Sequence, residues 1–211
     1  GAASERVSEV RAVLQPGAPP RQAAAQKRAH VLREVVETLI FIAIVFVIAQ
    51  FGIGSFTVAD TSMSPQLKPG QIVVVYKWAY AFGSPSRGDV VVYHNPANLN
   101  QVLAGRVIGV PGDTVAISPS TVSVDGVVLN EAAYTTIAPG VNPNSQGIGT
   151  FKLGPTDYYV LNDTRLSSSD SRSFGTIPRS DIVGQASLVF WPLKDLHGIS
   201  TYPDTFKNVH Q

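Results

Sequence analysis

The sequence of 211 residues contains no cysteine and a single methionine, Met63. Without cysteine the chain holds no disulfide, no thiol nucleophile and no cysteine-ligated zinc site. Charge is also scarce, since 15% of the residues are charged and 44% are hydrophobic, which argues against a disordered chain. The net charge is only +1, so we expect no nucleic-acid partner, because such binding calls for a basic patch. The length leaves room for one or two domains with a real core.

The longest stretch without charge is strongly apolar and covers residues 38–59, which read TLIFIAIVFVIAQFGIGSFTVA. A helix rises 1.5 Å per residue, so these 22 residues can cross a bilayer core of roughly 30 Å. A buried core helix is one alternative, but the stretch shows no polar face. A cleavable signal peptide is another, but its n-region would be about 37 residues long. We therefore predict a retained transmembrane helix at residues 38–59, in contact with the lipid bilayer.

Positive side chains close to this stretch lie on its N-terminal side. Arg28 and Arg33 precede it, whereas the first cation after it is Lys68. Positive residues favour the cytoplasmic side of a membrane, so residues 1–37 are predicted to form a cytoplasmic tail. Residues 60–211 would then lie on the periplasmic or extracellular side of the cell membrane.

The body of the chain, residues 60–211, has the pattern of a mainly-β domain. Its apolar segments are short, rich in β-branched residues and bounded by Gly, Pro, Asn and Asp, and none shows a sustained helical period. The clearest predicted strands are residues 72–76, 89–93, 106–110, 114–117, 121–124, 127–129, 158–161 and 186–190. Asp125-Gly126 between two alternating runs predicts a two-residue hairpin turn. Residues 138–149 are rich in Gly, Pro, Asn and Ser and are predicted to form a surface loop.

Three stretches carry the residues that could perform chemistry. They are residues 60–67 (DTSMSPQL), 103–113 (LAGRVIGVPGD) and 162–175 (NDTRLSSSDSRSFG), with residues 87–92 (RGDVVV) between the first two. Taken singly, each has an ordinary structural explanation as a turn, a hairpin loop or a surface ion pair. Together, in this order and after an apolar span, they resemble the type I signal peptidase family over nearly all of residues 38–193.

This resemblance implies a membrane-anchored serine protease with a β-rich fold that removes signal peptides from secreted preproteins by a Ser–Lys dyad. It implies that Ser62 is the nucleophile and that its backbone N–H is one oxyanion donor. Ser168 would orient the general base, and Asp170 with Arg172 would support that part of the site. The dyad lysine falls at the position of Gly105, and the resemblance implies no cofactor and no metal.

Two departures from the family pattern concern catalysis directly, and a third is mild. A serine hydroxyl needs a neighbouring base to take its proton, and Gly105 supplies none. Arg106 cannot replace the lysine, because it stays protonated and points to the other face of its strand. Asp60 would repel the negative charge that develops on the oxyanion. Thr164 stands where the family usually has Asn, and His94, at a strand end, is the best-placed substitute base.

Two hypotheses from different classes follow. The first is a working signal peptidase with an unusual base, whose partners are the signal peptides of preproteins. The second is a catalytically impaired relative that acts as a scaffold or binding subunit beside other membrane proteins. The absent lysine and Asp60 favour impairment, whereas retention of Ser62 favours activity.

Overall fold

A computed structural model describes residues 20–81, 83–135, 146–167 and 169–209 of the chain. The chain divides into two units, Gly1–Ala49 and Gln50–Gln211, which are described separately below. Most of the surface loop predicted at residues 138–149 lies outside the described residues, and Gly149 begins a strand.

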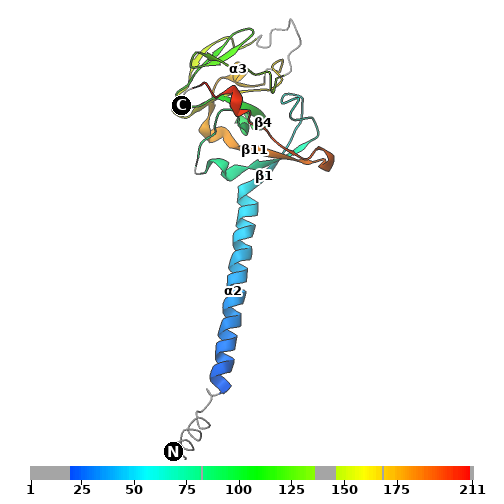
Figure 1. Cartoon of the computed structure of the whole chain (residues 1–211), viewed down its shortest axis with the longest axis vertical. Helices are drawn as coiled ribbons and strands as arrows, with labels where there is room; N and C mark the ends of the chain where they lie inside the picture. Colours follow the sequence, from blue (N-terminus) through cyan, green and yellow to red (C-terminus); the bar gives the residue numbers. More distant parts are fainter. Residues whose placement is uncertain (1–19, 82, 136–145, 168, 210–211) are drawn as a thin grey trace, which may run out of the picture. The chain divides into compact units, whose positions relative to one another are not determined.

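The first unit consists, in its described part, of most of helix α2, Pro20–Gly52 (Figure 1). From residue 38 to residue 48 every side chain is exposed, and nearly all of them are large and apolar. The prediction of one helix through residue 59 is wrong at its end, because the helix stops at Gly52 and Ile53–Thr57 form strand β1. Two glycines and β-favouring residues occur there, and strand β2 offers a pairing edge. Within the described part of the chain, no helix is both long enough and apolar enough to cross a membrane.

The second unit is built around one large antiparallel sheet. Its strands are β1, β2 (Ile72–Tyr76), β3 (Val90–Asn95), β4 (Asn98–Gly109), β9 (Asp157–Leu161), β10 (Ile177–Pro178), β11 (Ile182–Trp191) and β12 (His197–Gly198). Their order is β1-β2-β11-β3-β4-β9-β10, and β12 pairs with β11 beside this path. Figure 1 labels β1, β4 and β11 in this body. The sheet brings β1, which precedes the first motif, and β4, which carries the second, into one unit.

A second sheet has four strands in the order β7-β6-β5-β8. They are β5 (Thr114–Ile117), β6 (Val122–Val124), β7 (Val127–Val128) and β8 (Gly149–Lys152). The predicted hairpin is confirmed: Asp125 and Gly126 join β6 to β7 with φ values of 49° and 80°. Two successive positive φ angles are those of a type I′ turn, whose twist matches that of the paired strands.

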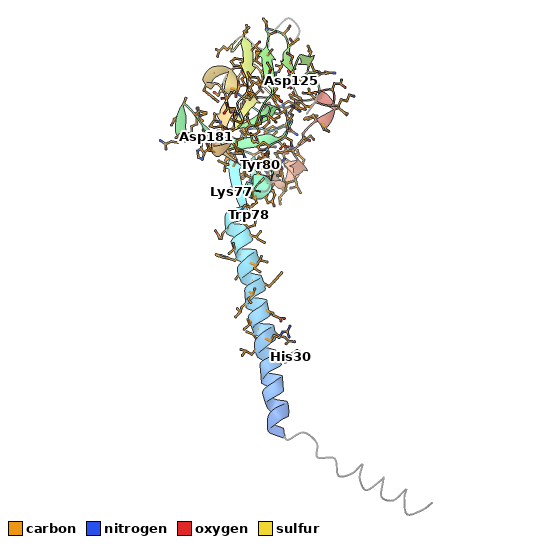
Figure 2. The ribbon with its side chains drawn as sticks, turned by 90° about the vertical axis from the view of Figure 1, so that its left-hand side faces the viewer. His30, Lys77, Trp78, Tyr80, Asp125 and Asp181 are labelled. Carbon is orange, nitrogen blue, oxygen red and sulfur yellow. The ribbon has the colours of Figure 1, made fainter. Side chains whose placement is uncertain are left out.

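Helical segments in the second unit are short. They are α3 (Ser171–Phe174) and the 3₁₀ turns η1 (Lys77–Tyr80), η2 (Arg179–Asp181), η3 (Leu193–Asp195) and η4 (Pro203–Thr205). The predicted mainly-β body is therefore confirmed, and each predicted strand overlaps an observed one. Figure 2 shows Lys77, Trp78 and Tyr80 close together on η1. The indole of Trp78 lies against Gly52, where a Cβ would be 3.4 Å from the ring, so η1 covers the start of β1.

Three buried clusters form the core. One joins the second sheet to β4 and β9 and includes Ile108 and Phe206. Another surrounds Tyr93 on one side of β3 and β4. The third holds Met63 and Leu67 against β2, β3, β4 and β11. The segment that carries the first motif is therefore anchored in the core, and the long strand β4 contributes to all three clusters.

Candidate functional site

The first motif forms a tight loop after β1. Met63 is 1% exposed and Leu67 is completely buried, and the Leu67 N–H donates to the Met63 carbonyl oxygen over 2.8 Å. Ser62, the expected nucleophile, is half-buried beside these anchors. It borders a small hollow that is otherwise lined by Phe56, Val58, Ala59, Asp60, Met63, Leu67, Val102, Leu103 and Ala104. The loop thus presents Ser62 to this mainly apolar hollow, which we call the groove at Ser62, between the end of β1 and the middle of β4.

The backbone N–H of Ser62 is already engaged. It donates a hydrogen bond of 2.8 Å to Oδ1 of Asp60, whose side chain is exposed. A carboxylate that accepts from this N–H occupies the direction from which an oxyanion would approach, and it places negative charge there. From the sequence, Asp60 was expected to repel the negative charge of an oxyanion. In the structure, the same carboxylate also accepts the hydrogen bond that the Ser62 N–H would donate to an oxyanion.

Within the described residues, the Ser62 hydroxyl has no hydrogen-bond partner. A serine that is to act as a nucleophile normally lies within hydrogen-bond reach of its base, even though such bonds can be long before substrate binds. No base among the described side chains meets this requirement.

The position of Gly105 in β4 is packed on all sides. The residue pairs with Val91 of β3. A Cβ built on Gly105 would lie 2.5 Å from Cγ1 of Val160, 3.4 Å from the carbonyl oxygen of Leu161 and 3.4 Å from Cε1 of Tyr93. All of these neighbours are buried. The space where a side chain would leave the strand is therefore filled by the two adjacent strands.

The alternative base that the sequence suggested, His94, lies at the wrong place. The strand register pairs His94 with Val102, three positions along β4 from Gly105, which corresponds to about 10 Å. Its Nδ1 lies 3.0 Å from the carbonyl oxygen of Leu99 at the tip of the hairpin. Tyr93 is closer to Gly105, but burial first, and then the charge of Asp170, raises the pKa of its phenol above the ordinary value. A phenol that stays protonated cannot accept the serine proton.

Arg106 points away from the Gly105 packing, as predicted. Its side chain is completely buried and forms a two-point ion pair with Asp163, with Nε and Nη2 at 2.8 and 2.7 Å. It also donates to Oε1 of Gln66 and to the carbonyl oxygens of Gly88 and Ser200. Burial raises the pKa of Asp163, although Arg106 opposes that shift. The arginine is thus a structural node that joins four segments.

The third motif is a buried ion-pair network and not a surface feature. Asp170 accepts from the backbone N–H groups of Arg172 and Asn162, both over 3.0 Å, and thereby caps helix α3. The Arg172 guanidinium lies 2.7 Å from the Asp170 carboxylate and donates to the Arg165 carbonyl oxygen over 2.6 Å. The surface ion-pair alternative for this motif is wrong. Ser168, the expected base-orienting residue, lies outside the described residues.

Thr164 joins the first and third motifs. Its N–H donates to the carbonyl oxygen of Ser62 over 2.8 Å. Its hydroxyl donates to the carbonyl oxygens of Thr61 and Ser64 over 2.7 and 3.1 Å. In the sequence, Thr164 stood out only as a departure from the family motif. A hydroxyl there fastens the Ser62 loop through hydrogen bonds on both sides of that residue.

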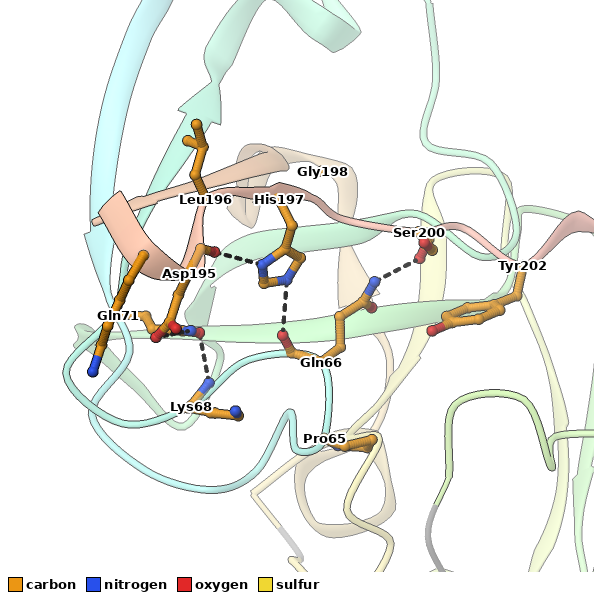
Figure 3. A pocket seen from close by; sticks show the side chains of 11 residues that line it. Pro65, Gln66, Lys68, Gln71, Asp195, Leu196, His197, Gly198, Ser200 and Tyr202 are labelled. Carbon is orange, nitrogen blue, oxygen red and sulfur yellow. Dashed lines mark hydrogen bonds between the residues drawn. The ribbon is translucent and has the colours of Figure 1, made fainter. Parts of the chain in front are cut away.

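The C-terminal segment provides further support that no sequence motif marked. The two ring nitrogens of His197 lie 2.7 Å from the carbonyl oxygen of Asp195 and 3.3 Å from that of Gln66 (Figure 3). The Gln66 amide reaches the carbonyl oxygen of Ser200 over 3.4 Å. These contacts attach the Ser62 loop to the segment around β12. No cluster of described His, Asp or Glu side chains is arranged to hold a metal ion.

The sequence of this chain is similar to those of known proteins. Residues 31–191 match the family model described as "Signal peptidase, peptidase S26". Signal peptidase IB of Staphylococcus aureus (strain COL) is 36% identical over 198 residues, covering 83% of this chain and 99% of the relative. Signal peptidase I of Leptolyngbya laminosa is 32% identical over 199 residues, which cover 89% of this chain and 95% of that relative. The crystal structure of a signal peptidase I from Enterococcus faecalis V583 is 29% identical with a TM-score of 0.43, covering 49% of this chain and 97% of that one.

Proposed function

Because the chain belongs to the signal peptidase family, peptidase S26, we propose that it is a membrane-anchored protein that binds signal peptides of preproteins and cleaves them poorly. The observation that carries the impairment is the filled space at Gly105, together with a Ser62 hydroxyl that has no base within the described residues. Family membership supports the signal peptide as the substrate. The groove beside Ser62 is the place where that peptide would bind.

In the reaction, the Ser62 hydroxyl would attack the scissile carbonyl, its proton would pass to a base, and an acyl-enzyme would form with release of the leaving amine. Loss of a general base lowers the rate by roughly 10²–10⁴. Loss of one oxyanion donor lowers it by roughly 10²–10³. Asp60 imposes part of the second loss, because its carboxylate must leave the Ser62 N–H before that group can stabilise an oxyanion.

Helix α2 supports the proposed anchor. Its side chains from residue 39 to residue 48 are exposed and apolar on all sides, which is unfavourable in water and favourable in lipid. From residue 38 to Gly52 the helix rises about 22 Å, which is shorter than the bilayer core. A bilayer accommodates such a short span by local thinning and by snorkelling of flanking side chains such as Arg33. We propose that the N-terminal tail is cytoplasmic and that the β body lies on the outer side. Release of the protein from membranes by alkaline carbonate would argue against the anchor.

Restoring the lysine tests the proposed impairment. Gly105→Lys alone should remain nearly inactive, because Cγ1 of Val160 blocks the first carbon of the new side chain. The double variant Gly105→Lys/Val160→Ala removes that methyl group and should cleave a secretory preprotein in detergent solution. Ser62→Ala in the double variant is the control and should abolish the gain. A double variant that folds and stays inactive would contradict the view that the absent lysine limits the reaction.

A non-catalytic subunit of a membrane complex is the second candidate. It is favoured by an intact, well-anchored Ser62 loop that has neither a base nor a free oxyanion donor among the described residues. This candidate predicts stable association with defined membrane subunits, and that association should be unchanged by Ser62→Ala. Loss of the association in that variant would speak for a substrate-like contact instead.

A further inference from the structure

A second hollow of about 540 Å³ lies on another part of the body and shares no lining residue with the groove at Ser62. It is formed by the segment before β3, the β4–β5 turn, the start of β9 and the start of η2. Its lining residues are Ser84, Pro85, Ser86, Arg87, Val110, Pro111, Asp113, Pro155, Thr156, Tyr158 and Arg179. The volume is within the range of sites for small organic molecules, roughly 300–1,000 Å³.

Part of the wall of this hollow is apolar and stiff. Pro85, Pro111 and Pro155 come from three different segments, and Val110 lies beside them. Each proline ring fixes its own φ angle, so these segments lose little additional freedom when a ligand binds. The hollow is therefore a preformed surface for an apolar group.

Among the residues that line the hollow, positive charges outnumber negative ones. Arg87 and Asp113 form a two-point ion pair over 2.8 Å, and their charges cancel. Arg179 donates to the carbonyl oxygens of Tyr80 over 2.8 Å and Ile182 over 3.4 Å, and it lies over the Tyr80 ring. Within the described residues no carboxylate comes within ion-pair distance of Arg179. These bonds use two of its five N–H donors, so the group can still bind an anion.

Tyr158 supplies a second donor at the same place. The residue is 2% exposed, yet its hydroxyl has no hydrogen-bond partner among the described residues. The hydroxyl is not one of the polar atoms sealed inside the protein, and the residue lines the hollow, so its phenol opens into that space. Tyr158 and Arg179 both line this hollow. An otherwise buried donor without a partner, in a hollow that also holds a cation, is typical of a site built for an anion.

We propose that this hollow binds a monocarboxylate on an apolar body, with the carboxylate held by Arg179 and Tyr158 and the body packed against the three prolines. The site lies outside the groove at Ser62 and does not depend on signal-peptide cleavage. A carboxylate fits because the guanidinium and the phenol can each donate to one of its two oxygens.

The test is a ligand-observed ¹⁹F NMR titration of the full-length chain in detergent, with 4-fluorobenzoate as the probe. The neutral isostere 4-fluorobenzamide is the matched control ligand and also reports partitioning into the micelle. We expect saturable binding of the benzoate and binding of the amide weaker by about tenfold or more, because a hydrogen bond to a charged group is replaced by a neutral one. Ser62→Ala should leave both affinities unchanged, which separates this site from the proposed function.

Two variants assign the binding to these residues. Tyr158→Phe removes only the hydroxyl and should weaken benzoate binding about tenfold, while the exposed Tyr76→Phe should not change it. Arg179→Gln should abolish the preference for benzoate over benzamide, while Arg33→Gln, which removes a cation elsewhere, should preserve it. Absence of saturable binding, equal affinity for the two probes, or an unchanged affinity in folded Tyr158→Phe would overturn the proposal.

Discussion

Substitution of Gly105 by alanine gives the most direct physical test of the packing at the expected base position. The new Cβ would lie 2.5 Å from Cγ1 of Val160, whereas carbon atoms in contact are about 3.5–4.0 Å apart. The valine is completely buried and β-branched, so it cannot swing away by a small rotation. Leu161 and Tyr93, at 3.4 Å, close the other directions.

The expected cost is the balance of two effects. Overpacking of a core costs roughly 1–3 kcal/mol. Replacing glycine by alanine lowers the conformational entropy of the unfolded chain, which stabilises the folded protein by about 0.4–1 kcal/mol. Taking the middle of each range, we expect Gly105→Ala to lower the free energy of unfolding by about 1.3 kcal/mol. Urea unfolding followed by tryptophan fluorescence should show a lower midpoint with an unchanged slope.

A matched glycine and a double-mutant cycle complete this experiment. Gly198→Ala is the control, because no atom lies within 4 Å of its Cβ position and its effect should stay within about 0.5 kcal/mol. Combining Gly105→Ala with Val160→Ala removes the clash, so the two costs should fall short of additivity by about 1 kcal/mol or more. A neutral Gly105→Ala, or an additive cycle, would refute the argument that Val160 fills this space.

Three further predictions concern other parts of the structure. In the Gly105→Lys/Val160→Ala variant, adding Asp60→Ala should raise preprotein cleavage by at least about tenfold, because it frees the Ser62 N–H for the oxyanion. Asp163→Ala should lower the free energy of unfolding in urea by about 3–5 kcal/mol, because it leaves the buried partner of this carboxylate unpaired. Burial raises the pKa of four tyrosines, so the folded chain keeps phenolic protons that the unfolded chain loses above pH of about 10. These tyrosines are Tyr80, Tyr93, Tyr134 and Tyr159. Below pH of about 10 these tyrosines should not affect the free energy of unfolding. Above that pH each tyrosine should lower it by up to about 1.4 kcal/mol per pH unit. Their tyrosinate absorbance should therefore appear only together with loss of the circular dichroism signal.

Each of these predictions has its own contrary result. A cleavage rate that Asp60→Ala leaves unchanged would mean that the carboxylate does not block the oxyanion donor. Asp181→Ala, which removes a carboxylate that forms no ion pair among the described residues, is the control for Asp163→Ala and should have a small effect. Full ionisation of all tyrosines near pH 10 in a chain that keeps its circular dichroism would contradict the alkaline mechanism.

The strands and the order of the motifs could be predicted because they depend on local patterns. Alternation of apolar residues and the Asp125-Gly126 turn located most of the sheet. The short strands β1, β8, β10 and β12 were missed, since segments of two to five residues near glycine or proline carry little pattern of their own and form through pairing. At residues 53–57 the apolar composition suited a helix and a strand equally, and the free edge of β2 decided between them.

The candidate site was predictable in its residue types and not in its contacts. The motif located Ser62, and side-chain alternation along a strand placed Arg106 on the face opposite Gly105. The role of Thr164 and the attachment by His197 depend on contacts between segments about 100 and 131 positions apart, which no local pattern encodes.

We propose that this member of the signal peptidase family binds signal peptides but cleaves them poorly, and the rate of cleavage of one preprotein tests this proposal most directly. The rate should be measured for the unmodified full-length chain and for Ser62→Ala under identical conditions. We predict that the two rates differ by less than about tenfold, because no base lies within hydrogen-bond reach of the Ser62 hydroxyl among the described residues. Efficient turnover by the unmodified chain that disappears in Ser62→Ala would contradict the claim.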